Sequence, residues 1–307
     1  MSHRSSAAAM AAACGAAFLW GTGALVVNLL IARFGMSPES ISFWRFVVGA
    51  VLLAALFARR PVWAGLRAQA AWLLGAGTCM ALYVLCWFLG IARIGAAVPT
   101  LIALCLPPVL VTLLAVARGR ERLDGALVAT LVAALAGTAL VVVRHGGVST
   151  GASAAQLAEG VALSVASAVL YAGFTLVSGR LSLALGAGPA TMGLTVVAAA
   201  VMALSALYTP LRWPHEVPPE AWLLYLGIAT AALALLAFTW GAARLTPTAL
   251  TVATLVEPLT AVLLAAALLG ESLSAAQWLG AALMIAAIAA LGRRDARRAT
   301  PQPPHAV

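Results

Sequence analysis

The second half of this chain repeats the first half, and this repeat is the strongest constraint on its fold. Each half holds five apolar segments of similar length, placed in the same order. The positions that match at offsets of 150 and 151 are Trp72-Leu73-Leu74 with Trp222-Leu223-Leu224, Phe88 with Phe238, Arg93 with Arg244, and Pro107 with Pro258. At the larger offset, Phe18-Leu19-Trp20 also aligns with Val169-Leu170-Tyr171. If each segment crosses a membrane, five crossings per half require the second half to lie inverted relative to the first.

The composition shows that the segments are suited to lipid rather than to water. Hydrophobic residues make up 64% of the chain and charged residues only 9%, whereas soluble proteins are about 25% charged. The net charge of +9 is carried by Arg, because the chain contains no Lys. A basic chain can indicate binding to nucleic acid. Here the Arg residues fall between apolar segments and at the C-terminus, so we expect no nucleic-acid partner and a membrane lipid environment.

Ten segments are long enough to span a bilayer as helices. A helix needs about 20 residues to cross about 30 Å of hydrocarbon, and a helix satisfies its own backbone hydrogen bonds in lipid. The segments are 9–32, 39–58, 70–92, 96–117, 125–143, 157–179, 188–208, 221–243, 247–269 and 275–292. The sequence therefore predicts an all-α integral membrane protein, built as two inverted five-helix repeats over 9–143 and 157–292. Inverted repeats of this kind are typical of secondary transporters.

The distribution of Arg predicts the orientation. With the N-terminus inside, thirteen Arg residues fall on the inner side, and only Arg33, Arg93, Arg144 and Arg212 fall on the outer side. Positive residues accumulate on the cytoplasmic side of membrane proteins, so both termini are predicted to be cytoplasmic. Residues 293–307 are polar and rich in Pro, and we expect a disordered cytoplasmic tail there.

Three motifs carry a resemblance to a known family. They are Phe18-Leu19-Trp20-Gly21-Thr22, Phe43-Trp44-Arg45-Phe46, and Glu257-Pro258-Leu259 followed by Leu269-Gly270-Glu271. In their order and spacing they resemble the EamA-type members of the drug/metabolite transporter superfamily, from about residue 10 to 292. The resemblance implies a ten-helix carrier that exports small metabolites, often amino acids, across a bacterial inner membrane. One departure is that Leu106 stands in the first half where Glu257 stands in the second.

Glu257 is the foremost candidate for a functional residue, because it lies near the middle of the ninth segment. An ionisable group at that depth costs about 2.5–3.5 kcal/mol and usually faces a cavity or a partner. The functional hypothesis is contact with a substrate amine or proton coupling, which rests on Glu257 alone. The alternative is a carboxyl group that packs between helices and bonds backbone freed by Pro258.

Other polar and aromatic residues at membrane depth are candidate contacts for a small-molecule substrate. Hydroxyl groups at three- and four-residue spacing share one helix face, and they either line a path or bond their own helix. The aromatic pair Tyr83 and Trp87 lies too deep to mark an interface, and packing is the alternative to substrate contact. The candidate substrate-binding residues are Trp20, Asn28, Tyr83, Trp87, Ser167, Tyr171, Trp240, Thr254 and Glu257.

A second group of residues is predicted to be structural. Arg45 is expected to have an intramolecular role by pairing with a carboxylate on another helix, and the alternatives are pairing with a substrate carboxylate or reaching the outer interface. Pro107 and Pro108 are expected to break the fourth helix, and the carbonyls freed there to form part of a site or a hinge. Pro258 is expected to kink the ninth helix. Gly270 and Glu271 are expected to end that helix and to bond a neighbouring helix.

The motifs of enzymes are missing from the sequence. It contains no GxSxG, no HExxH and no phosphate-binding glycine-rich loop, and its four His residues fall in predicted tails or loops. We therefore expect no enzymatic activity, no metal and no cofactor. A lipid flippase or a membrane scaffold that transports nothing remains the alternative to a carrier. The sequence leaves the oligomeric state open, because small residues pack helices within and between subunits alike.

Overall fold

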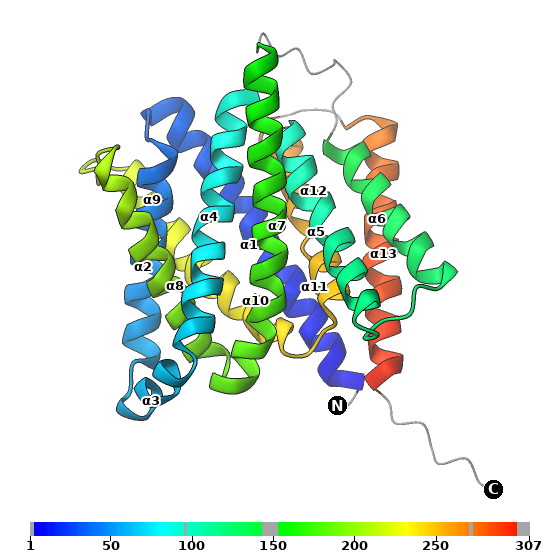
Figure 1. Cartoon of the computed structure of the whole chain (residues 1–307). Coiled ribbons are helices and arrows are strands. Elements are labelled where there is room, and N and C mark those ends of the chain that lie inside the picture. The colour runs from blue at the N-terminus through cyan, green and yellow to red at the C-terminus, as the bar shows by residue number, and fades with distance from the viewer. Residues whose placement is uncertain (1–2, 95–96, 143–152, 270–272, 300–307) are drawn as a thin grey trace, which may run out of the picture.

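The computed structural model describes residues 3–94, 97–142, 153–269 and 273–299, which form helices joined by short connections (Figure 1). No strand occurs in these ranges. The first half comprises α1 (His3–Phe34), α2 (Pro38–Phe57), α3 (Arg60–Ala68), α4 (Ala70–Ile94), α5 (Ala97–Ala117) and α6 (Gly125–Val142). The second half comprises α7 (Ala154–Leu185), α8 (Ala187–Ala203), η1 (Leu204–Leu207), α9 (Pro219–Tyr225), η2 (Leu226–Leu233), α10 (Ala234–Ala242), α11 (Pro247–Ala253), α12 (Val256–Leu269) and α13 (Ala275–Ala299).

The prediction of ten membrane spans is confirmed. Among the described residues, ten helical stretches are long and apolar enough to cross a bilayer. The eighth span is made of α9, η2 and α10 in succession, and the ninth is made of α11 and α12. The helix α1 leads away from the end of the molecule near which both termini lie, whereas α7 leads back towards it (Figure 1). An inverted repeat requires these opposite directions, although the inversion itself stays a prediction.

Local sequence explains where several helices begin and turn. Ser37 accepts a hydrogen bond from the Ser40 amide and caps α2, and Ser153 and Gln156 form a reciprocal capping box at the start of α7. Such caps satisfy amide groups that have no partner within the helix. Gly186 alone separates α7 from α8 and has a φ of 82°. Glycine adopts this left-handed backbone without a steric cost, which allows the sharp reversal.

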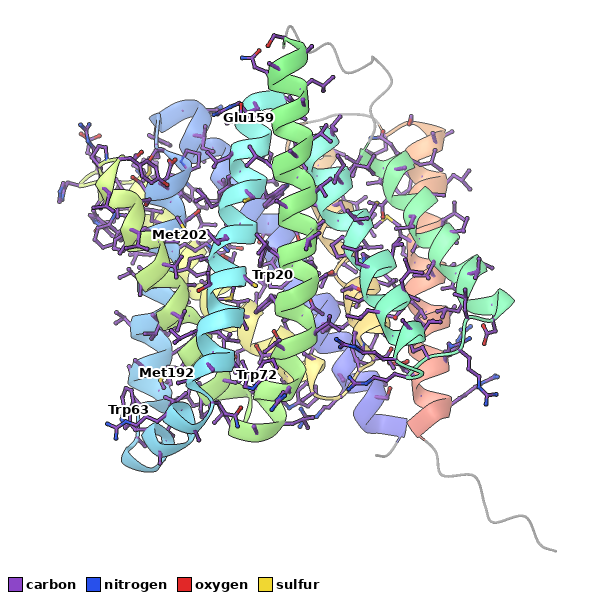
Figure 2. All side chains as sticks on the ribbon, viewed as in Figure 1. Trp20, Trp63, Trp72, Glu159, Met192 and Met202 are labelled. Atoms are coloured by element: carbon purple, nitrogen blue, oxygen red, sulfur yellow. The ribbon has the colours of Figure 1, made fainter. Side chains whose placement is uncertain are left out.

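The two ends of the molecule carry different side chains. Figure 2 shows Trp63 and Trp72 near the end where the chain termini lie, and Glu159 at the opposite end. Trp63 and Trp72 are exposed, and the Arg180 guanidinium lies 4.1 Å from the Trp72 ring centroid. Tryptophan is enriched where a membrane meets water. These residues therefore mark an interface at the end near the termini.

The structure corrects the predicted start of the tail at residue 293. The helix α13 continues to Ala299, so its C-terminal turns extend beyond the predicted span. Arg294 forms an ion pair with Asp124 at 2.7 Å, and Asp295 accepts hydrogen bonds from the amide and hydroxyl of Thr246. These contacts hold the polar end of α13 against its neighbours. Residues 300–307 lie outside the described residues.

The structure also corrects the predicted break at Pro107 and Pro108, because α5 is a continuous helix through both residues. A proline removes the hydrogen bond to the carbonyl four residues earlier, which here means the carbonyls of Ala103 and Leu104. Both of those residues line the central cavity described below. Irregular hydrogen bonding at membrane depth is tolerated beside such a cavity, so the helix continues without a break.

The most extensive contacts join a helix of one half to a helix of the other. The helix α4 packs along α7, α2 along α8 and η2, α1 along α10 and α12, and α6 along α13. Glycines allow close approach at several of these seams. At the crossing of α6 and α13, an added Cβ on Gly137 would lie 2.7 Å from the Gly280 carbonyl oxygen. The halves are therefore interleaved, and the space at the centre is bounded by both.

Candidate functional site

A central cavity lies where helices of both halves meet. Its walls come from α1, α2, α4 and α5 of the first half and from α7, η2 and α12 of the second. The cavity volume is about 50 Å³, which is enough for a few water molecules. The lining residues are Trp20, Gly23, Ala24, Val27, Arg45, Tyr83, Val84, Trp87, Phe88, Ala103, Leu104, Ser167, Tyr171, Thr230 and Glu257.

A second cavity adjoins the first and is larger, with a volume of about 310 Å³. The two cavities share Trp87, Phe88, Leu104 and Glu257, among others. The second cavity also contacts Asn28 and residues near the ends of α4 and α6 that lie away from the chain termini. Its walls are mainly apolar. Glu257 therefore lies at the junction between the small cavity, which Arg45 also lines, and a larger one.

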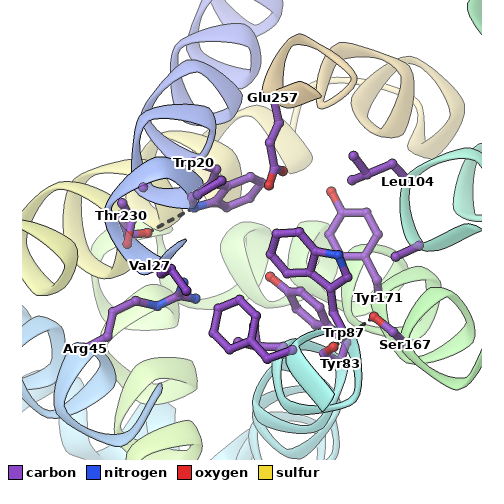
Figure 3. A pocket seen from close by; sticks show the side chains of 15 residues that line it. Trp20, Val27, Arg45, Tyr83, Trp87, Leu104, Ser167, Tyr171, Thr230 and Glu257 are labelled. Atoms are coloured by element: carbon purple, nitrogen blue, oxygen red, sulfur yellow. Dashed lines mark hydrogen bonds between the residues drawn. The ribbon is translucent and has the colours of Figure 1, made fainter. Parts of the chain in front are cut away.

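Glu257 reaches the cavities because the ninth span is interrupted. The helix α11 ends at Ala253, and Glu257 is the second residue of α12, so its carboxylate belongs to a first helical turn. The amide groups of a first turn favour negative charge. The Glu257 side chain has no hydrogen bond or ion pair with another described residue, and it points into the central cavity (Figure 3).

Pro258 explains where this interruption falls. In a continuous helix the amide of residue 258 would donate to the carbonyl of Thr254, and proline has no such donor. The Thr254 carbonyl instead accepts from the Glu257 amide at 3.0 Å, and the Leu255 amide donates to Val252 at 3.1 Å. The predicted kink is thus an interruption at residues 254–255, one turn before the proline. Pro258 itself occupies the first turn of α12, where a missing amide costs little.

Arg45 extends from α2 into the same central cavity, across from Glu257 (Figure 3). The residue is 9% exposed, and its Nε atom is buried with no hydrogen-bond partner in the part of the chain that the structure describes. Its guanidinium lies 5.0 Å from the ring centroid of Phe46. The expected intramolecular ion pair of Arg45 is therefore not found among the described residues, and the side chain faces the cavity instead of the outer interface.

The helix α1 forms another wall through the motif at residues 20–23. The Trp20 Nε1 donates a hydrogen bond of 3.0 Å to the Thr230 carbonyl in η2. An added Cβ on Gly21 would lie 2.6 Å from the Glu257 carbonyl oxygen, and one on Gly23 would lie 2.7 Å from the Thr230 side chain. Gly21 therefore allows α1 to lie directly against the turn that carries Glu257, and Gly23 allows it to lie against η2.

The element η2 is a π-helical segment, in which each amide bonds the carbonyl five residues earlier. It contacts α2 closely, since an added Cβ on Gly227 would lie 3.3 Å from the Arg45 carbonyl oxygen. On α2, an added Cβ on Gly49 would lie 2.9 Å from the Ala231 Cβ. The segment thus fixes the backbone of Arg45 on one side and accepts the Trp20 hydrogen bond on the other.

The hydroxyl groups of α7 have two different roles. Ser167 donates to the Tyr83 carbonyl on α4 at 2.8 Å, and the Tyr171 hydroxyl donates to the Thr254 Oγ1 at 3.1 Å. Both Ser167 and Tyr171 line the central cavity. Other hydroxyl groups of α7 bond carbonyls of their own helix, as those of Ser164 and Ser178 do. Some hydroxyl groups of α7 therefore line the cavity, and others only form hydrogen bonds within their own helix.

A cluster of aromatic rings lies beside the central cavity. The Phe174 and Phe238 rings stack with centroids 5.4 Å apart, and both residues are fully buried. Trp20 contacts Phe238 at 5.4 Å between centroids, and Tyr83 contacts Tyr171 at 5.1 Å. The lining aromatics Trp20, Tyr83 and Tyr171 are therefore held in place by packing, which gives the cavity a defined wall.

Most of the predicted substrate-binding residues are brought together. Trp20, Tyr83, Trp87, Ser167, Tyr171 and Glu257 line the central cavity, and Asn28 lines only the adjoining one. Thr254 lines neither cavity, but its hydroxyl holds Tyr171.

Trp240 also lines neither cavity, because its ring lies 4.1 Å from the Arg244 guanidinium near the end of α10. Gly270 and Glu271, which were predicted to be structural, lie outside the described residues.

Three contributions to the site could not be found from the sequence. The Thr230 carbonyl is available because of the π-helical segment, for which residues 226–233 show no recognisable signal. Val84 and Phe88 are apolar lining residues that resemble any other core residue in sequence. Arg45 was recognised as a motif residue, but its lack of an internal partner depends on the packing of α2.

Comparisons with known proteins agree with this architecture. The model of the EamA-like transporter family matches residues 7–143 and again residues 158–293. A relative described as the uncharacterized transporter YwfM of Bacillus subtilis (strain 168) is 29% identical, over 94% of this chain and 95% of its own length. A crystal structure at 24% identity has a TM-score of 0.77 over 94% of this chain and 99% of that chain, which shows likeness of fold. This chain is therefore a multi-pass membrane protein that belongs to the EamA-like transporter family.

Proposed function

We propose that this protein is a secondary carrier that exports small metabolites, such as amino acids, across the bacterial inner membrane by alternating access. The observation that carries the proposal is the central cavity, which helices of both halves line and into which the unpaired Glu257 carboxylate points. A carboxylate at membrane depth is costly unless it serves a cavity. A site between two halves is the arrangement on which alternating access depends.

The orientation in the proposal has both termini in the cytoplasm. Both ends of the described chain lie at the same end of the molecule (Figure 1). Arg67, Arg122 and Arg180 are found in connections or helix ends on that side, and Trp63 and Trp72 lie there as well. An excess of Arg is typical of the cytoplasmic side. The larger cavity then extends towards the outside.

The test is transport by the purified protein in liposomes, with a panel of radiolabelled amino acids. Wild-type protein is expected to move at least one of them, and Glu257→Gln is expected to lower the initial rate about ten- to hundredfold, since a charged hydrogen bond is lost. Glu159→Gln is the matched control, because Glu159 is exposed and pairs with Arg93 far from the cavity. Equal rates for Glu257→Gln and wild type would contradict the assigned role of the cavity.

Proton coupling and direction need separate measurements. In the proposal Glu257 binds a proton when it does not bind the substrate. An imposed pH gradient is therefore expected to drive net transport by wild-type protein. Glu257→Gln is expected to lose this response to the gradient. Efflux from preloaded liposomes of known orientation measures the direction. Gradient-driven transport that survives in Glu257→Gln would exclude coupling through this residue.

A further inference from the structure

We propose that Arg45 binds the carboxylate of a zwitterionic substrate whose ammonium group is held by Glu257. The inference rests on the proposed carrier function and names its substrate class as α-amino acids with an apolar side chain. It also replaces the structural role that the sequence suggested for Arg45 with a role in substrate binding.

The first argument is that Arg45 is buried and unsatisfied. The side chain is more than nine-tenths buried and lines the cavity, and its Nε has no hydrogen-bond partner in the described parts of the chain. No carboxylate of those parts lies within 4.0 Å of its guanidinium. Buried charges in proteins are normally paired, because an unpaired one carries an uncompensated desolvation cost. The Arg45 guanidinium is therefore available to a partner within the cavity.

The second argument is that Arg45 and Glu257 are held apart. They enter the cavity from α2 and α12 and do not form an ion pair, although both face the same space (Figure 3). Their backbones are fixed by close glycine contacts, with Gly227 against the Arg45 carbonyl and Gly21 against the Glu257 carbonyl. A ligand that carries both charges can satisfy the two groups at these positions.

The third argument concerns the chemistry of the ligand. A guanidinium binds a carboxylate through two parallel hydrogen bonds, and a carboxylate binds an ammonium group through charge-assisted bonds. A simple amine would leave Arg45 unpaired beside a second cation, and a simple acid would meet Glu257 as a second anion. A zwitterion satisfies both groups and leaves the occupied cavity neutral.

The fourth argument concerns size and polarity. The central cavity, at about 50 Å³, suits a charged head group and some water. The adjoining cavity, at about 310 Å³, has walls that include Trp87, Phe88 and Ile91. Because Glu257 borders both, a head group held there would direct the side chain into the larger apolar space. An aromatic or branched aliphatic side chain fits this space best.

The test measures equilibrium binding to the detergent-purified full-length protein by calorimetry, with two matched ligand series. The first is phenylalanine, phenethylamine and 3-phenylpropionate, and the second is leucine, isopentylamine and 4-methylpentanoate. In at least one series, wild-type protein is expected to bind the amino acid about ten- to hundredfold more tightly than either analogue. Failure of both amino acids to bind, or equal binding of the analogues, would overturn the proposal.

Variants of Arg45 and Glu257 then test which charged group of the ligand each residue binds. Arg45→Gln is expected to weaken amino-acid binding about ten- to hundredfold and to leave binding of the amine unchanged or tighter. Glu257→Gln is expected to weaken binding of the amino acid and to leave binding of the acid analogue unchanged. Arg93→Gln, which removes an exposed Arg paired with Glu159, is the control and is expected to match wild type.

The outcomes separate a failure of this inference from a failure of the carrier. If Arg45→Gln keeps the wild-type preference for the amino acid over the amine, Arg45 does not bind the carboxylate, whatever is transported. If the preferences behave as expected but liposomes show no transport, the carrier fails and the ligand assignment stands. Should Arg45→Gln not fold, Arg45→Lys keeps the charge without the paired donors. It is then expected to bind the amino acid at least about tenfold more weakly at unchanged amine affinity, and wild-type affinity would contradict the proposal.

Discussion

The crossing of α6 and α13 gives a sharp test of the packing. An added Cβ on Gly137 would lie 2.7 Å from the Gly280 carbonyl oxygen, and one on Gly280 would lie 2.6 Å from the Gly137 carbonyl oxygen. Ordinary contacts begin near 3.4 Å, so either substitution to Ala must separate the helices by roughly 0.7 Å. A gap of this size forfeits about a quarter to a half of each affected dispersion contact.

From these distances we expect Gly280→Ala to lower the free energy of unfolding by about 1–3 kcal/mol, the range measured for overpacked sites. The measurement is unfolding by increasing SDS in mixed micelles, followed by tryptophan fluorescence. Gly15→Ala is the control, because its Cβ would meet nothing within 4 Å on an exposed face of α1. Alanine is the better helix former by about 1 kcal/mol in water, so the control is expected to match or exceed wild type.

A double substitution tests whether both single losses of stability arise at the same contact between α6 and α13. Once the first added methyl group has separated α6 from α13, the second meets a gap that already exists. The cost of Gly137→Ala and Gly280→Ala together is therefore expected to be smaller than the sum of the two single costs. Wild-type stability in both single variants would refute the reasoning, because the helices would then lie farther apart than the structure shows.

Two further predictions concern hydrogen bonds that position the site and the C-terminal end of α13. Trp20→Phe removes the donor to the η2 carbonyl and is expected to cost about 0.6–1.7 kcal/mol, the range found for such bonds in membranes, measured by the same SDS unfolding; a stability above wild type would contradict it. Asp295→Asn weakens the charged acceptor of the Thr246 amide, and we expect a loss of about 1 kcal/mol. Faster hydrogen exchange at the start of α11 would locate that loss, and unchanged exchange there would argue against the contact.

Much of the fold could be predicted because apolar length and the spacing of Arg are properties of the sequence itself. The ten spans follow from segments such as 125–143, whose predicted start is also the start of α6. Other features depend on contacts between distant residues. Arg294 and Asp295 extend α13 because Asp124 and Thr246 lie beside them, and no local pattern indicates those partners.

The candidate site shows the same division. Glu257 and Tyr171 could be recognised because polar residues at membrane depth are rare and costly. Trp240 was a weaker candidate, named as an aromatic residue in the eighth span, and it stacks against Arg244 and lines neither cavity. The unpaired state of Arg45 was also hidden from the sequence, since a motif residue with a charge usually finds a partner within the protein.

The interruption before Pro258 has a lasting consequence for motion. Pro258 has no amide hydrogen, so no rearrangement of the protein can form the hydrogen bond from residue 258 to the Thr254 carbonyl that a continuous helix would have. The angle between α11 and α12 can therefore change with little loss of backbone bonding, unlike that of an unbroken helix such as α4. Glu257 lies just past this interruption, so a small change in that angle would move its carboxylate relative to the two cavities that it borders.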